Sequence, residues 1–86
     1  MKVNLPTPLV DYTNGQRDVS AVGNTLNELL YDLDRQYPCI RFRMIDEQGN
    51  VRAHIKLFVD RELQRDLDFL LTERSEVMIV AALSGG

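Results

Sequence analysis

One strongly amphipathic segment, residues 25–38, constrains the fold of this 86-residue chain more than any other feature. Its apolar side chains follow the spacing i, i+3, i+4 and i+7 of a single helix face, and they are Leu26, Leu29, Leu30 and Leu33, extended by Tyr37. Thr25, with Glu28 three residues later, is a capping-box pattern that begins a helix, and Pro38 ends it. The segment therefore predicts one main helix, whose apolar face the rest of the chain has to cover.

The segment before this helix alternates as a β-strand does. In residues 3–10, Val3, Leu5, Thr7 and Leu9 alternate with Asn4 and two prolines, which indicates a half-buried strand. The two prolines place this strand at an edge or interrupt its pairing. Asn14 and Gly15 supply the positive backbone angles of a tight turn, and alternation resumes at residues 19–21. We therefore expect an N-terminal hairpin over residues 2–22.

The segment after the helix is less regular. Residues 39–51 are expected to be irregular or to form a short strand that ends in a turn at Gly49. In that strand, one side would carry Ile40, Phe42 and Met44.

Two further strands are predicted in the last third of the chain. Residues 53–60 alternate, with Ile55, Leu57 and Val59 on one side and His54, Lys56 and Phe58 on the other. Residues 61–75 are polar and indicate a crossing loop that holds a short strand or helical turn. Residues 76–83 are nearly continuously apolar, as expected of a strand in the middle of a sheet.

The order hairpin, helix, strand, crossing segment, strand predicts an α+β roll. A mixed sheet of four or five strands with one main helix in this order is the arrangement of the β-grasp, or ubiquitin-like, fold. We expect residues 1–80 to form the β-grasp domain and residues 81–86 to form a flexible C-terminal tail that ends in Gly-Gly.

Charge and composition exclude several classes of function. The net charge is −3 at pH 7 and the charges are mixed along the chain, so we expect no nucleic-acid binding. No apolar run is long enough to span a membrane, and two prolines precede any apolar run of signal-peptide length. Cys39 is the single cysteine, which fits a reducing compartment, and we expect a cytoplasmic protein.

Residues that could carry out catalysis are isolated from one another. His54 shares its predicted strand with no serine or cysteine nucleophile, and Cys39 follows a proline at a helix end, where a packed or inert thiol is expected. Their spacing matches no zinc motif, and the internal glycines match no phosphate-binding loop. We therefore expect no metal and no bound cofactor, and a carrier or binding module that is not itself an enzyme.

The end of the chain, Leu83-Ser84-Gly85-Gly86, is the remaining candidate site. Glycines have no Cβ, so they can enter a narrow channel and present the α-carboxylate of Gly86 to another protein's active site. Attack of this carboxylate on the α-phosphate of ATP gives a mixed anhydride with AMP, and a sulfur nucleophile can then displace AMP and leave a thiocarboxylate. We expect a separate enzyme to perform this activation.

A second candidate surface lies on the sheet face opposite the helix. If Val77, Ile79 and Ala81 face the helix, then Phe58, Met78 and Val80 face away from it. Apolar side chains on an open face beside the chain end favour a docking patch for a partner. The alternative is that residues 61–75 cover this face.

Three stretches of the chain resemble the ThiS/MoaD family of ubiquitin-like sulfur carriers, over essentially the full length. They are the opening VNLPTPLVDYTNGQ, the helix TLNELLYDLDRQYP and the close SEVMIVAALSGG. The opening is most similar to the CysO branch, which serves cysteine biosynthesis, and to the related carrier for the siderophore thioquinolobactin. The chain departs from the family at Arg74-Ser75, where members often have Gly-Asp, and at residues 81–84, where they often have proline and a small residue.

The resemblance implies a function and a set of partners. Gly86 would carry the sulfur as a covalent thiocarboxylate, made by an ATP-dependent enzyme of the ubiquitin-activating type. The implied partners are this adenylating and sulfurtransferase enzyme, a sulfur-accepting enzyme of cysteine, sulfur-metabolite or siderophore biosynthesis, and a metalloprotease that trims or releases the C-terminus.

Three alternatives remain open at the level of the sequence. The chain could be the small subunit of molybdopterin synthase, whose large subunit receives the tail. It could be a protein modifier that forms isopeptide bonds with lysines, or a β-grasp interaction module in which the terminal glycines are incidental.

Overall fold

Five strands form one mixed sheet in the order β2-β1-β5-β3-β4 in the computed structural model, whose described residues are 1–82. The strands are β1 (Lys2–Asn4), β2 (Asp18–Ser20), β3 (Ile55–Val59), β4 (Glu62–Gln64) and β5 (Glu76–Ala81). β1 and β5 are parallel, and the other neighbouring pairs are antiparallel. The mixed five-stranded sheet confirms the predicted α+β class, with β5 in the middle as expected.

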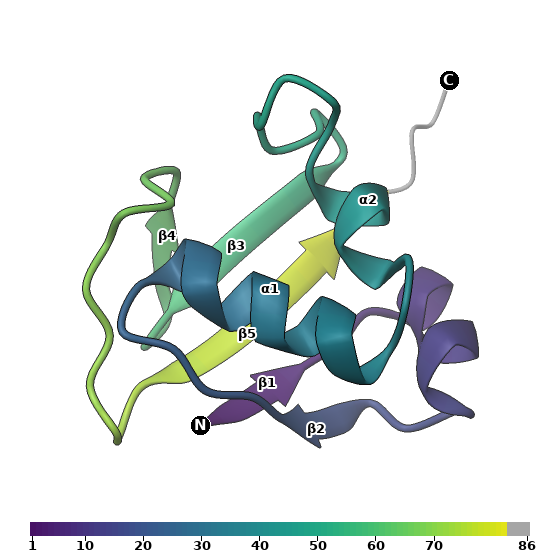
Figure 1. The fold of residues 1–86 in the computed structure, drawn as a ribbon, viewed down its shortest axis with the longest axis horizontal. Helices are drawn as coiled ribbons and strands as arrows, with labels where there is room; N and C mark the ends of the chain where they lie inside the picture. The colour runs from purple at the N-terminus through teal and green to yellow at the C-terminus, as the bar shows by residue number, and fades with distance from the viewer. Residues whose placement is uncertain (83–86) are drawn as a thin grey trace.

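The main helix, α1 (Leu26–Gln36), has the predicted cap and the predicted buried face. The Thr25 Oγ1 accepts a hydrogen bond from the main-chain N–H of Glu28 at 3.1 Å, and the Glu28 carboxylate accepts one from the N–H of Asn24 at 3.0 Å. The four leucines of the stripe are completely buried. α1 lies across one face of the sheet (Figure 1), and the core fills the space between them.

The N-terminal hairpin is confirmed in its pairing but not in the length of its first strand. β1 pairs with β2 through Val3 opposite Val19, and Asn14 and Gly15 turn the chain with φ of 55° and 86°. Between β1 and β2 the chain forms a 3-10 helix, η1 (Thr7–Thr13), although the sequence predicts that the first strand continues to residue 10. Pro8 accounts for the difference, because its fixed φ and missing N–H suit the first turn of a helix better than a strand.

The segment after α1 differs from its prediction as well. Residues 40–44 form a short helix, α2 (Ile40–Met44), instead of an irregular segment or strand. Ile40 and Met44 are buried, but the side chain of Phe42 is 53% exposed and does not share their face. Positions i and i+4 lie on the same side of a helix and also of a strand, so Phe42 at i+2 is the residue that distinguishes the two.

The last two predicted strands are present, and the crossing segment holds a short strand, β4. Ile55, Leu57 and Val59 of β3 are buried as expected, whereas His54 lies in the turn before the strand rather than on it. Gly49 turns the chain with a φ of 83°, as predicted.

The sheet extends into the segment predicted as a tail. Ala81 belongs to β5, and the main-chain N–H of Ala82 donates a hydrogen bond to the carbonyl oxygen of His54 at 2.7 Å. The pairing of β5 with β3 therefore holds the chain as far as Ala82, two residues beyond the predicted boundary at residue 80.

Candidate functional site

The central strand β5 carries the chain toward its C-terminus along the middle of the sheet. The predicted site residues Leu83, Ser84, Gly85 and Gly86 lie outside the described residues, so their roles stay predictions. The last described residue, Ala82, is attached to the turn that precedes β3 by its hydrogen bond to His54. The surfaces around Ala82 are those nearest to the last described residue of the chain.

The sheet face turned away from α1 carries the predicted apolar side chains. Met78 and Val80 are 44% and 36% exposed, and Phe58 is half-buried. Phe58 lies opposite Met78 on β5 and opposite Leu63 on β4, whose side chain is 42% exposed. We refer to Phe58, Leu63, Met78 and Val80 as the sheet-face patch. Leu63 was not predicted, because its strand could not be placed beside β3 from the sequence.

Apart from β4, which contributes Leu63 to the patch, the crossing segment does not cover this face of the sheet. Its main chain runs beside α1, where the N–H groups of Leu26 and Asn27 donate hydrogen bonds to the carbonyl oxygens of Phe69 and Leu67. Leu67 and Leu71 pack against the core from the helix side. The exposed fractions of Met78 and Val80 therefore agree with an open apolar face, and not with the alternative that residues 61–75 cover it.

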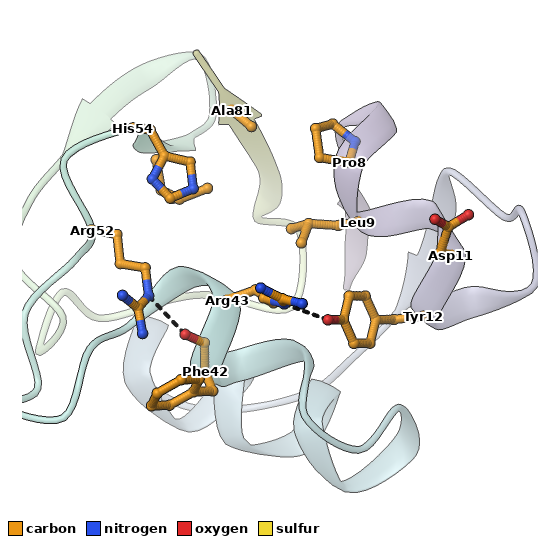
Figure 2. A pocket seen from close by; sticks show the side chains of 10 residues that line it. Pro8, Leu9, Asp11, Tyr12, Phe42, Arg43, Arg52, His54 and Ala81 are labelled. Carbon is orange, nitrogen blue, oxygen red and sulfur yellow. Dashed lines mark hydrogen bonds between the residues drawn. The ribbon is translucent and has the colours of Figure 1, made fainter. Parts of the chain in front are cut away.

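A hollow of about 590 Å³ lies at the end of β5 (Figure 2). We call it the chain-exit hollow and define it by Tyr12, Phe42, Arg43, Arg52, His54 and Ala81. These residues come from η1, α2, the loop before β3 and the last residue of β5. Sequence reasoning missed the hollow because it placed residues 3–10 in a strand and residues 39–51 in an irregular segment or short strand, and not in helices that pack together.

Each arginine of the hollow is held by an aromatic residue. The Arg43 Nε donates a hydrogen bond to the Tyr12 hydroxyl, and its guanidinium carbon lies 5.8 Å from the centre of the Tyr12 ring. The Arg52 Nε donates one to the carbonyl oxygen of Phe42 at 2.8 Å, and its guanidinium carbon lies 4.7 Å from the Phe42 ring. The hydrogen bond to Tyr12 raises the pKa of Arg43, and the guanidinium group of an arginine is positively charged in proteins in any case.

The two arginines lack carboxylate partners within the described part of the chain. Among residues 1–82 the one ion pair joins Arg35 to Asp32 on α1, at 2.8 Å. Asp11 also lines the hollow but lies in no ion pair there. The hollow therefore presents two oriented guanidinium groups, together with the exposed His54, on a chain whose net charge is −3.

The described residues show no arrangement typical of metal binding or nucleophilic catalysis. Residues 1–82 hold no group of three or more His, Cys, Asp and Glu that could bind a metal ion. Cys39 is exposed at the start of α2, and His54 is exposed in the hollow. None of the helices in this range is long and apolar enough to cross a membrane.

One main helix packed on a mixed five-stranded sheet, whose central strand is the last strand of the described chain, defines a small ubiquitin-like protein of the β-grasp fold. The sulfur carrier protein CysO of Mycobacterium tuberculosis is 33% identical to the chain over 89 residues, which cover 98% of this chain and 96% of the relative. No family model matches the chain. The chain belongs to the family of CysO sulfur carrier proteins.

Solved structures agree with this assignment. The crystal structure of M. tuberculosis CysO has a TM-score of 0.89 at 31% identity and covers 95% of this chain and 98% of its own. CysO in the Amycolatopsis orientalis BexX/CysO complex has a TM-score of 0.89 at 26% identity, over 99% and 98%. SAMP1 of Haloferax volcanii, at 24% identity, has a TM-score of 0.83 over 100% and 98%, and shows the shared fold alone.

Proposed function

We propose that the chain carries sulfur on the carboxyl carbon of Gly86 and donates it to a biosynthetic enzyme that makes cysteine or a related sulfur metabolite, including a siderophore. Membership of the CysO family supports this proposal most directly. The Gly-Gly end agrees with it, since the reactive group would then be the terminal carboxylate. An ATP-dependent enzyme of the ubiquitin-activating type would prepare that group.

The proposed chemistry runs in two balanced steps. The Gly86 carboxylate oxygen attacks the α-phosphate of ATP, pyrophosphate leaves, and an acyl-adenylate forms. A sulfide-level sulfur nucleophile then attacks the acyl carbon, AMP leaves with one of the former carboxylate oxygens, and a thiocarboxylate remains. Its sulfur is ionised at neutral pH and can act as a nucleophile toward the acceptor's substrate, as thiolates do.

The point at which the sheet ends sets the reach of this chemistry. Four residues follow Ala82, and a chain of four residues spans at most about 14 Å. An active site that reaches Gly86 therefore has to come close to the end of β5. The absence of side chains at the last two positions removes the bulk that would keep such an active site at a distance.

The sheet-face patch is the proposed docking surface for the enzymes that act on Gly86. The patch spans two adjacent strands: Met78 and Val80 belong to β5, and Phe58 lies opposite Met78 on the neighbouring strand β3. Burial of apolar surface is the dominant favourable contribution to most protein–protein association, so an exposed apolar patch favours docking of a partner. The metalloprotease that trims or releases the C-terminus, and the cytoplasmic location, belong to the same proposal.

Intact-mass measurement tests the proposal. The chain is incubated with ATP, a sulfur source and an adenylating enzyme encoded beside it or known to act on CysO proteins. We expect a mass gain equal to the replacement of one oxygen by one sulfur, and no gain in a variant that lacks Gly86 or carries a C-terminal tag. A wild-type chain that never gains this mass with an enzyme that converts a CysO control would refute the proposed function.

A further inference from the structure

We infer that the chain-exit hollow is a second docking site, which binds carboxylate side chains of the enzyme that adenylates the chain end. This inference rests on the proposed function, since it assumes that such an enzyme exists. It differs from the sheet-face patch in position and in chemistry. The patch is apolar and lies on the open face of the sheet, whereas the hollow is cationic and lies between η1, α2 and the end of β5.

The position of the hollow places it in the path of any enzyme that reaches Gly86. Ala81 lines it, and Ala82 is hydrogen-bonded to His54, another of its residues. Because four residues span at most about 14 Å, the rim of an active site that holds Gly86 has to approach the hollow. Adenylation is also required if the chain is a molybdopterin synthase subunit or a protein modifier, so the adenylating enzyme is the partner common to these alternatives.

The two arginines of the hollow are oriented in a way that suits binding of an anionic partner. Arg43 and Arg52 each use Nε in an internal hydrogen bond, which fixes the plane of the guanidinium group. Within residues 1–82, their terminal Nη groups have no hydrogen-bond partner. A guanidinium group held in one orientation loses less conformational entropy on binding, and its paired N–H groups match the two oxygens of a carboxylate.

The negative net charge of the chain distinguishes the cationic hollow from the rest of the surface as a site for carboxylates. The net charge is −3, so the chain as a whole repels acidic surfaces. An acidic rim on the enzyme would meet two oriented guanidinium groups at the hollow, where Asp11 is the one carboxylate of the lining, and would thereby orient the carrier with its chain end toward the active site. Charge complementarity of this kind improves specificity and the rate of encounter more than it adds to affinity.

Steady-state kinetics of adenylation test the inference. The double variant Arg43→Gln/Arg52→Gln is compared with Arg74→Gln, which removes an exposed arginine in the turn before β5, at the opposite end of that strand. ATP–pyrophosphate exchange is measured at several concentrations of the chain and of NaCl. We expect the double variant to raise the KM for the chain about tenfold or more, with kcat unchanged and with a weaker dependence on salt. The control should match the wild type.

Further outcomes separate a docking role of the hollow from a role in binding the nucleotide. The variant Arg43→Lys/Arg52→Lys keeps both charges but not the planar groups, and it should fall between the wild type and the glutamine variant. A KM within about twofold of the wild type, with the same salt dependence, would overturn the docking role but leave the proposed function standing. If the KM for ATP rises instead, the hollow contributes to binding the nucleotide, and this result would also overturn the docking role. Absence of exchange with the wild-type chain would overturn the proposed function itself.

Discussion

Replacing Gly23 with alanine should destabilise the fold more than any other single-methyl addition at a glycine of the described chain. Gly23 lies just before α1, and a Cβ added to it would lie 2.5 Å from the main-chain nitrogen of Leu29 and 2.8 Å from the carbonyl carbon of Glu28. Both are backbone atoms of α1, so no side chain can rotate away to make room. The start of the helix or the segment before it has to move.

The size of the effect follows from the bonds that resist this movement. The N–H of Val22 donates to the Asp32 carboxylate at 3.0 Å, and that of Asn24 donates to the Glu28 carboxylate at 3.0 Å. Overpacking costs about 1–3 kcal/mol, and each weakened hydrogen bond adds about 1 kcal/mol. The lower entropy of alanine in the unfolded chain offsets about 0.4–1 kcal/mol of this loss. We therefore expect Gly23→Ala to lower the free energy of unfolding by about 2–5 kcal/mol.

Urea unfolding followed by far-UV circular dichroism measures this change. Gly49→Ala is the matched control, because the added Cβ meets nothing within 4 Å and the cost comes only from a φ of 83°. That cost should be about 1–2 kcal/mol. A Gly23→Ala variant as stable as the wild type, or less affected than the control, would show that the close approach of Gly23 to α1 does not constrain the fold.

Three further predictions concern the patch, the pH dependence of stability and the β3–β4 turn. The variant Met78→Asp/Val80→Asp should lower the free energy of unfolding by about 1–2 kcal/mol, because both side chains are only partly exposed and aspartate is unfavourable in a strand, yet leave the protein folded. It should raise the KM for the chain in adenylation about tenfold; an unchanged KM would exclude the patch as a docking surface. The hydrogen bond from Arg35 is the main cause that lowers the pKa of Asp32 in the folded protein. The ionised Asp32 carboxylate therefore contributes stability above its unfolded pKa of about 3.9, and this contribution is lost as the pH falls through the lower folded pKa. Asp32→Asn should therefore be less stable than the wild type at pH 7, with a gap that narrows in acid-titrated urea melts; a gap that stays constant to low pH would contradict this assignment. Arg61 has a φ of 74°, so Arg61→Gly should raise the free energy of unfolding by about 1 kcal/mol in the same assay, whereas a loss would mean that the side chain contributes more than its backbone strain costs.

Local patterns in the sequence were sufficient to predict α1, β3 and β5. The leucine stripe of α1 has the helical period, and the capping residues Thr25 and Glu28 are close in sequence to the groups they bind. The alternation of Ile55, Leu57 and Val59 has the strand period. Periodicity records which side of an element is buried, so these predictions needed no knowledge of distant contacts.

Short elements with few positions could not be assigned in this way. η1 and α2 have too few turns to show a period, and Ile40 and Met44 are equally consistent with a strand. Pro8 favours the helical turn of η1 locally, whereas the helical form of α2 is decided by packing, since α2 contacts both α1 and η1 in the folded protein. Propensity is a weak guide where tertiary contacts of this kind are available.

The sequence by itself therefore determined α1, β3 and β5, and it predicted the group proposed to react at Gly86, because periodicity and residue type are local properties. The tertiary structure decided which side of β5 stays open, since the sequence shows both sides of this strand as apolar. Only the tertiary structure reveals the chain-exit hollow, because Tyr12 and Arg43, which form a hydrogen bond there, are 31 residues apart in the sequence. Such a contact depends on how η1 and α2 pack, and no local pattern records it.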